Sequence, residues 1–208
     1  MASSLTSIAS GFYSRGWLLG TSGNLSAVVN REPLSLAMSP SGLDKGALLP
    51  EQFMLIDEHA LPVGGGDGRP SAESLLHIRI VRERGAGAVL HTHSIWSTML
   101  SDLHAEAEGL AIEGYEMLKG LEDVATHEHS EWLPILENSQ DMPALADKVG
   151  EALRQHPKAH GFLLRRHGLY SWGNDLAQAK RHVEILEFLL EAVGRTLLAK
   201  SGGEPAEV

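Results

Sequence analysis

Residues 71–96 read SAESLLHIRIVRERGAGAVLHTHSIW, and this stretch decides the fold class. Apolar residues recur at helical spacing over 71–84, behind a proline and a serine that suit a helix start, so a helix is predicted there. A GAG turn leads into the apolar segment 88–93, which predicts a buried strand, and residues 94–103 predict another helix. Helix, buried strand and helix in direct succession indicate an α/β protein.

The rest of the chain extends this pattern in both directions. Helices are predicted for residues 4–19, 142–156 and 174–200, and strands for residues 24–29, 34–39, 53–57, 133–137, 161–166 and 168–172. Asn174 is the expected cap of the last helix. Helices mixed with strand pairs of antiparallel appearance predict a three-layer α/β/α sandwich around a mixed, largely antiparallel sheet. We expect one domain over residues 1–200 and a flexible tail over residues 201–208.

The composition indicates which partners and which metal ligands to expect. The 208 residues include 17 basic and 27 acidic side chains, for a net charge of -10, which disfavours nucleic acid and anionic membranes as partners. Cysteine is absent, so a metal would need His, Asp or Glu ligands. A missing signal sequence and the lack of a long apolar run lead us to expect a cytoplasmic protein.

His91 and His93 are the first candidate metal ligands. Residues two apart on a strand project to the same face, so their imidazoles would lie side by side. That spacing alone leaves open a simpler interpretation, in which both rings face solvent or bond to the backbone. An otherwise apolar strand, and a third histidine, His167, at the end of another apolar strand, favour a shared metal.

A second pair with the same spacing serves as a comparison. His127 and His129 lie in THEHSEW, among Glu122, Asp123, Glu128, Ser130 and Glu131. We interpret this charged stretch as a solvated loop and not as a metal site.

Two carboxylates are candidate acid/base groups beside such a metal. Glu73 falls in the first turn of the predicted 71–84 helix, where the helix dipole favours the ionised form. Glu116 stands in GYEMLKG, between Tyr115 and Met117, which is unusual company for a solvated acid. Each is equally open to interpretation as an ordinary surface residue.

Glycine- and serine-rich stretches are candidate anion sites. GTSGNLS (20–26) and SPSGLDKG (39–46) combine glycines, which allow close backbone approach, with small polar donors, and Ser71 adds a donor at a helix start. Neither is a Walker loop, and such stretches are often simple turns. Lys45 and Arg166 are the candidate cations for a phosphate, against the alternatives of a solvated lysine and a structural ion pair.

Taken in order, TSGN, SPSG, PSAE, HTH and RRHG resemble the class II aldolase family of zinc-dependent sugar-phosphate enzymes. The resemblance spans about residues 4–200. It implies an α/β/α sandwich, a homotetramer with active sites near subunit interfaces, a sugar-phosphate substrate, and one Zn²⁺ per subunit. The zinc ligands implied by the family are His91, His93 and His167.

The resemblance also implies roles for other residues. The matching phosphate-binding positions are Thr21, Ser22, Gly23, Asn24, Ser39, Ser41, Gly42 and Ser71. Glu73 matches the acid/base glutamate of the aldolases, and Glu116 matches that of a dehydratase branch, which GAGAVLHTHS, YEMLKG, LPILEN and RRHGLYSWG resemble most. We therefore expect a hydro-lyase with Glu116 as the proton carrier and Glu73 near the metal.

Three alternatives remain open on the same scaffold. Two are enzymatic: an aldolase that cleaves a ketose 1-phosphate, and a pentulose-phosphate 4-epimerase. The third is a non-enzymatic binding domain like that of adducin. The presence of all three histidines disfavours this last alternative.

Overall fold

The computed structural model describes residues 1–64 and 69–201. Of the predicted tail, only Ser201 is described, as the last residue of a helix; residues 202–208 lie outside the described part. The core element is an eight-stranded sheet in the order β3-β2-β1-β4-β8-β7-β6-β5. The strands are β1 (Asn24–Arg31), β2 (Leu34–Met38), β3 (Met54–Asp57), β4 (Ala88–Thr92), β5 (Gly109–Glu113), β6 (Ser130–Leu136), β7 (Gly161–Leu164) and β8 (Gly168–Gly173). Of the neighbouring pairs, β6 and β7 run parallel and the others antiparallel, which confirms the predicted mixed sheet.

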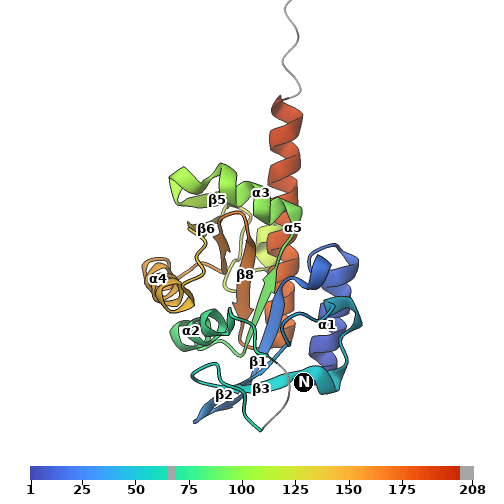
Figure 1. Cartoon of the computed structure of the whole chain (residues 1–208). Coiled ribbons are helices and arrows are strands. Elements are labelled where there is room, and N and C mark those ends of the chain that lie inside the picture. The colour runs from blue at the N-terminus through green and yellow to red at the C-terminus, as the bar shows by residue number, and fades with distance from the viewer. Residues whose placement is uncertain (65–68, 202–208) are drawn as a thin grey trace, which may run out of the picture.

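Helices cover both faces of the sheet (Figure 1). The helices are α1 (Ala2–Ser14), α2 (Ser74–Arg84), α3 (Ile95–Leu103), α4 (Met142–Gln155) and α5 (Leu176–Ser201), with short 3-10 turns η1 (Leu19–Thr21), η2 (Lys45–Ala47), η3 (Pro50–Gln52), η4 (Ala105–Ala107) and η5 (Glu116–Gly120). One apolar cluster joins the sheet to α2 and α4, and two others join it to α1, α3 and α5. This is the predicted three-layer α/β/α sandwich. No helix among the described residues is long and apolar enough to span a membrane.

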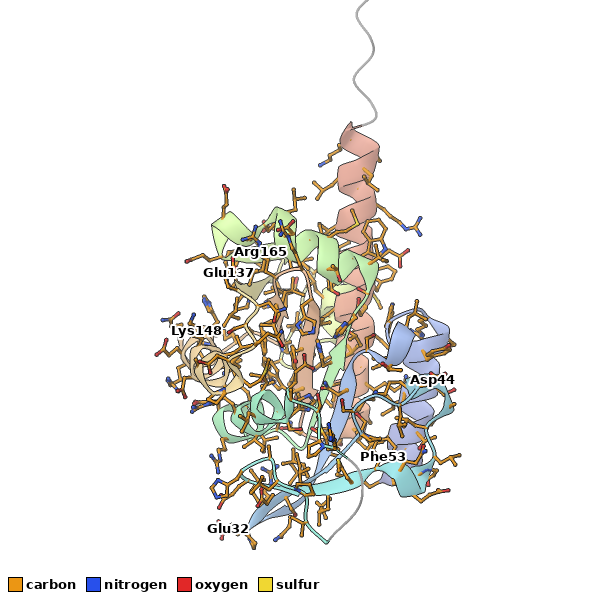
Figure 2. All side chains as sticks on the ribbon, in the orientation of Figure 1. Glu32, Asp44, Phe53, Glu137, Lys148 and Arg165 are labelled. Atoms are coloured by element: carbon orange, nitrogen blue, oxygen red, sulfur yellow. The ribbon has the colours of Figure 1, made fainter. Side chains whose placement is uncertain are left out.

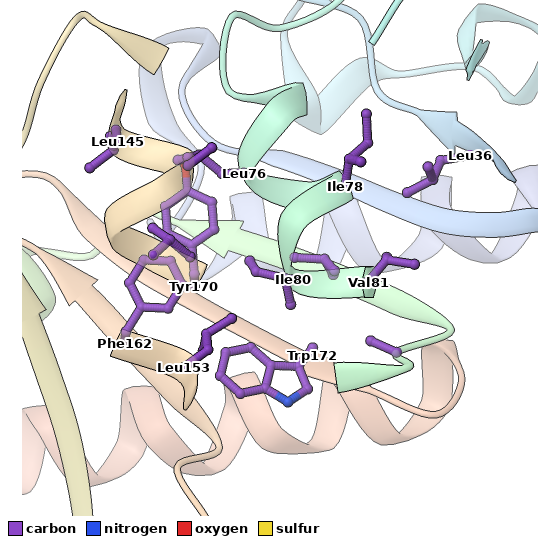
Figure 3. Packing of buried hydrophobic residues seen from close by; sticks show 14 of the residues in the cluster. Leu36, Leu76, Ile78, Ile80, Val81, Leu145, Leu153, Phe162, Tyr170 and Trp172 are labelled. Carbon is purple, nitrogen blue, oxygen red and sulfur yellow. The ribbon is translucent and has the colours of Figure 1, made fainter. Parts of the chain in front are cut away.

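Buried side chains of the central strands point alternately to the two faces of the sheet, so the core is divided between those faces. Tyr170 and Trp172 of β8 pack with α2 and α4, whereas Leu169 of the same strand packs with α5. Figure 3 shows Tyr170 and Trp172 beside Phe162 of β7, with aliphatic residues of α2 and α4 around them. A period of two places successive side chains on opposite faces, so both layers draw on the same strands.

Three details differ from the sequence-based expectations. The first helix ends at Ser14, and 3-10 turn η1 follows it. Strand β5 was not predicted; it is a short edge strand that pairs with β6. The cap of α5 is Asp175 and not Asn174, because the Gln178 backbone N–H donates to the Asp175 carboxylate at 2.8 Å.

The order of the strands brings distant segments to one end of the sheet. Since β4 and β8 are antiparallel with Thr92 opposite Leu169, the end of β4 lies beside the start of β8 and the turn before it. Strand β1 begins there too, with Asn24 opposite His91. Three of the predicted site segments therefore converge through strand pairing alone.

Candidate metal centre

The three predicted ligands meet at this end of the sheet. His91 Nε2 lies 2.8 Å from His93 Nε2 and 3.3 Å from His167 Nε2. A tetrahedral ion with bonds of about 2.0 to 2.1 Å places its ligand atoms about 3.3 Å apart, so the spacing suits a single ion. Within residues 1–64 and 69–201, these histidines form the one cluster of three or more candidate ligands that is compact enough for a metal.

The protonation of His91 also suits a metal ligand. Its Nδ1–H donates to the Leu169 carbonyl at 2.9 Å, which leaves the lone pair on Nε2 facing the other two histidines. Its ring stacks on Tyr170 with centroids 3.8 Å apart. Burial lowers the pKa of His91, and burial with the neighbouring His167 lowers the pKa of His93 to about 4, so both rings are neutral at neutral pH. The donor set therefore fits a divalent cation.

Two glycines allow the backbone to close around this cluster. A Cβ on Gly168 would stand 2.0 Å from the Thr92 carbonyl oxygen, and one on Gly23 would stand 2.7 Å from that of His91. Gly23 also has a φ of +67°, in the left-handed region that favours glycine. The glycine after His167 and the glycine of TSGN are thus needed for the chain segments to approach.

Glu73 is the carboxylate that the fold brings to the histidines. Its two carboxylate oxygens lie 3.1 Å from His167 Nε2 and 3.6 Å from His91 Nε2, and one also accepts from Asn24 Nδ2 at 2.5 Å. Burial alone would raise the pKa of Glu73, but His91, His167 and Asn24 together hold that pKa well below its usual range. Glu73 is therefore an ionised, firmly bonded group beside the candidate metal.

A cleft of about 240 Å³ opens next to Glu73, His93 and His167. Eight of the ten predicted phosphate-binding residues line it: Thr21, Ser22, Gly23, Asn24, Ser41, Gly42, Lys45 and Ser71. Asn138, Gln140 and Met142, which the motifs did not indicate, line it as well. The cleft is thus walled by small polar residues from three separate loops.

Lys45 is the cation of this cleft. Its ammonium donates to the carbonyl oxygens of Thr21 at 3.0 Å and Leu43 at 2.9 Å, which leaves one hydrogen for a ligand. The residue is 1% exposed, and burial lowers its pKa, with Asp44 and Glu73 acting in the opposite direction. Figure 2 labels Asp44, which marks the start of this turn. A buried ammonium is a strong partner for an anion because little water competes.

Two predicted phosphate ligands lie outside the cleft. The Ser39 hydroxyl is buried and accepts from the Leu25 backbone N–H at 3.0 Å, so it joins β1 to the end of β2. Arg166 pairs with Asp102 at 2.9 Å and lines a different, apolar cavity between α3 and α5. The neighbouring Arg165 pairs with Asp102 and with Glu137, each at 2.8 Å, and Figure 2 shows Arg165 beside Glu137.

Glu116 also lies away from the histidines of its own chain. It begins η5, is well exposed, pairs with Lys119, and lies 3.9 Å from His127. Strand β5, which precedes it, is four places from β4 in the sheet, or about 19 Å at 4.8 Å per strand. Strand β5 also runs antiparallel to β4, so the carboxyl ends of these two strands lie at opposite ends of the sheet.

The second histidine pair, His127 and His129, differs in exposure to solvent. His127 is exposed, as expected for a solvated loop. Glu128 and Ser130 are exposed too, but the expectation was wrong for Glu131, which is 1% exposed and accepts from His129 Nε2 at 2.9 Å and His160 Nδ1 at 3.0 Å. Glu131 lies inside β6, so its side chain must point to one face, and there two imidazoles compensate the buried charge.

Besides Asn138 and Gln140, the sequence motifs also missed a buried histidine of this region. His77, on α2, is fully buried and bonds to Asn24 and Ser26. A sequence signal was available, since His77 follows Glu73 by four residues and thus shares its helix face.

Known proteins resemble this chain in sequence and in fold. The class II aldolase and adducin N-terminal domain model matches residues 3–193. A methylthioribulose-1-phosphate dehydratase of Marinobacter nauticus is 42% identical over 89% of this chain and 88% of its own, and one of Pectobacterium atrosepticum is 44% identical over 85% of each. The L-fuculose-1-phosphate aldolase structure from Thermus thermophilus aligns with a TM-score of 0.75 at 23% identity, covering 97% of both chains. The chain therefore belongs to the class II aldolase and adducin N-terminal domain family.

Proposed function

We propose that this protein dehydrates 5-methylthioribulose 1-phosphate to 2,3-diketo-5-methylthiopentyl 1-phosphate, a step of methionine salvage. The observation that carries the proposal is the convergence of three histidines, a carboxylate beside them and a cleft with a buried ammonium. Two relatives at 42% and 44% identity that bear the name of this dehydratase support the choice of substrate. We likewise propose that residues 1–200 act as one catalytic domain; a cytoplasmic location stays a prediction.

We propose Zn²⁺ as the metal, one per subunit, with His91, His93 and His167 as its protein ligands. Three protein ligands leave an open position for substrate. When held by these histidines, Zn²⁺ would supply Lewis acidity toward the carbonyl of the substrate, which would make the proton on C3 easier to remove.

The cleft would hold the phosphate group of the substrate. Lys45 offers its remaining ammonium hydrogen, and the loops around Gly23 and Gly42 offer backbone N–H groups and hydroxyls. Since the Asn24 amide already bonds to Ser71 and Glu73, its side chain contributes to the site by holding Glu73. The net charge of -10 repels an anion at long range, so local donors must supply the affinity.

The reaction needs a carboxylate that removes the proton from C3 and gives one to the hydroxyl leaving C4. Loss of water gives an enol that becomes the diketone. Both oxygens of Glu73 are already engaged, with His167 on one side and Asn24 on the other, which suits a fixed residue beside the metal. We therefore propose Glu116 as the acid/base, as the dehydratase branch implies. A Glu116→Gln variant should bind Zn²⁺ normally yet lose dehydration, and a parental rate in this variant would refute the assignment.

Glu116 requires a second copy of the chain, because within one copy it lies at the far end of the sheet. We propose a homo-oligomer, a tetramer as in the family, in which Glu116 of one subunit serves the histidines of its neighbour. Mixing inactive His91→Ala and Glu116→Gln proteins, with reassembly, should then restore activity by pairing an intact metal centre with an intact Glu116. A mixture that assembles but stays inactive would contradict a shared site.

Product analysis separates this function from the aldolase and epimerase alternatives. Purified protein should convert methylthioribulose 1-phosphate to the diketone, and a chelator should abolish the conversion. Release of a dihydroxyacetone phosphate-type fragment from a ketose 1-phosphate would instead support an aldolase. A pentulose phosphate returned with inverted C4 would support an epimerase.

A further inference from the structure

A line of hydrogen bonds runs from the interior of β1 to the metal centre. His77 Nδ1 lies 2.7 Å from Ser26 Oγ, and His77 Nε2 lies 2.5 Å from Asn24 Oδ1. The Asn24 amide nitrogen in turn donates to Glu73 at 2.5 Å. Ser26, His77 and Asn24 are 0%, 0% and 3% exposed, so water does not replace any of these partners.

The direction of each bond follows from the orientation of the Asn24 amide. Its nitrogen donates to Glu73 and to Ser71, so its oxygen is the atom that accepts from His77. The His77 Nε2 must then carry a hydrogen. Because burial lowers the pKa of His77 to about 4, the ring is neutral, and its Nδ1 accepts from the Ser26 hydroxyl. One tautomer of His77 satisfies the whole line.

We propose that His77 is a positioning residue, whose Nε2–H holds the Asn24 amide in the orientation that fixes Glu73 beside His167. The inference rests on the proposed function, in which Glu73 is a fixed group at the metal. A half-turn of the amide would place its oxygen against the Glu73 carboxylate, and two acceptors repel each other. Glu73 would then leave the 3.1 Å contact with His167.

Substitution of His77 tests this role. Partners of metal-site ligands typically contribute 10- to 100-fold to activity, so His77→Leu should lower kcat by roughly 10- to 100-fold. It should leave KM within about threefold, since Lys45 bonds to Thr21 and Leu43 and to neither His77 nor Asn24. His77→Gln, whose amide can donate to Asn24, should recover most of kcat. Val149→Ala is the control: this buried residue of α4 belongs to the cluster that packs α4 against α2, so it loses stability but keeps kcat. A parental kcat in His77→Leu, or equal losses in His77→Leu and Val149→Ala, overturns the proposal.

Nitrogen-15 NMR of the imidazoles in the whole Zn²⁺-loaded protein gives a second readout that needs no activity. The His77 signals, identified by their loss in His77→Gln, should show one neutral ring with the hydrogen on Nε2. A hydrogen on Nδ1, or averaging between tautomers, overturns the proposal even if His77→Leu does not fold. If the parental protein fails to dehydrate methylthioribulose 1-phosphate while His77 shows the Nε2–H form, only the proposed function fails.

Discussion

Replacing Gly168 by alanine is the sharpest test of how the metal centre is built. The new Cβ would stand 2.0 Å from the Thr92 carbonyl oxygen and 3.2 Å from Cε1 of His91. A Cβ atom does not tolerate another heavy atom closer than 3.0 Å, so β4 and β8 must separate by at least about 1 Å where His91 and His167 meet. The backbone φ of Gly168 lies outside the left-handed region, so the cost comes from lack of space alone.

The magnitude follows from two distances. Overpacking costs about 1 to 3 kcal/mol, and we expect the upper end because backbone, not a movable side chain, blocks the methyl group. A displacement of about 1 Å is half the length of a histidine–zinc bond, so Zn²⁺ should bind at least about 100-fold more weakly.

The assay pairs two measurements on Gly168→Ala and one matched control. Urea unfolding of metal-free protein reports the packing cost, and titration against a competing chelator reports Zn²⁺ affinity. Gly11→Ala, on α1, introduces the same methyl group where it meets no described atom within 4 Å, so it should gain up to about 1 kcal/mol and keep parental Zn²⁺ affinity. Parental affinity and stability in Gly168→Ala would refute the view that this glycine is needed for close approach.

Three further predictions concern charge, phosphate and metal. The His77 ring is neutral in the folded protein, with a pKa of about 4 against 6.5 when unfolded, so the unfolded state binds more protons. The free energy of unfolding should therefore fall by about 2 kcal/mol from pH 8 to pH 5. Urea unfolding of the His77→Gln variant should lack that part of the loss. Lys45→Met should raise KM for the phosphorylated substrate about 10- to 100-fold with unchanged Zn²⁺ affinity, because it removes one charged hydrogen bond of about 1.5 to 3 kcal/mol. An unchanged KM in steady-state kinetics would contradict this prediction. Zn²⁺ at 100 times its Kd should stabilise the protein by about 2.7 kcal/mol, and a melting temperature that chelator does not lower would exclude the metal.

Much of the fold was predictable because its elements carry their own signals. Apolar periodicity located α2, α4 and the central strands. Strand β5 was not predicted because it is an edge strand of five residues, too short to show a clear apolar pattern. Asp175 rather than Asn174 caps α5, a difference of one residue that depends on the exact turn of the backbone.

The cluster of three histidines was predictable because histidine on a buried strand needs a partner; their role as metal ligands stays a prediction. Glu73 was placed near the metal by the family resemblance, and the structure brings it there. The orientation of Ser39 and Arg166 could not be predicted, since strand register and ion-pair partners decide it. The burial of Glu131 could not be predicted either, because its partner His160 is 29 residues away in the sequence.

The order of the strands has a consequence for biosynthesis. β8, which comes last in chain order among the described strands, occupies the middle of the sheet, between β4 and β7. Until it is made, the nascent chain holds two separate half-sheets, β3-β2-β1-β4 and β7-β6-β5, each with an open apolar edge. A chain that has emerged only through β7 also has two of the three histidines, because His167 follows that strand. The three histidines can thus come together only after the chain has emerged beyond His167, and release before that point leaves a product that can neither close its sheet nor form the candidate metal centre.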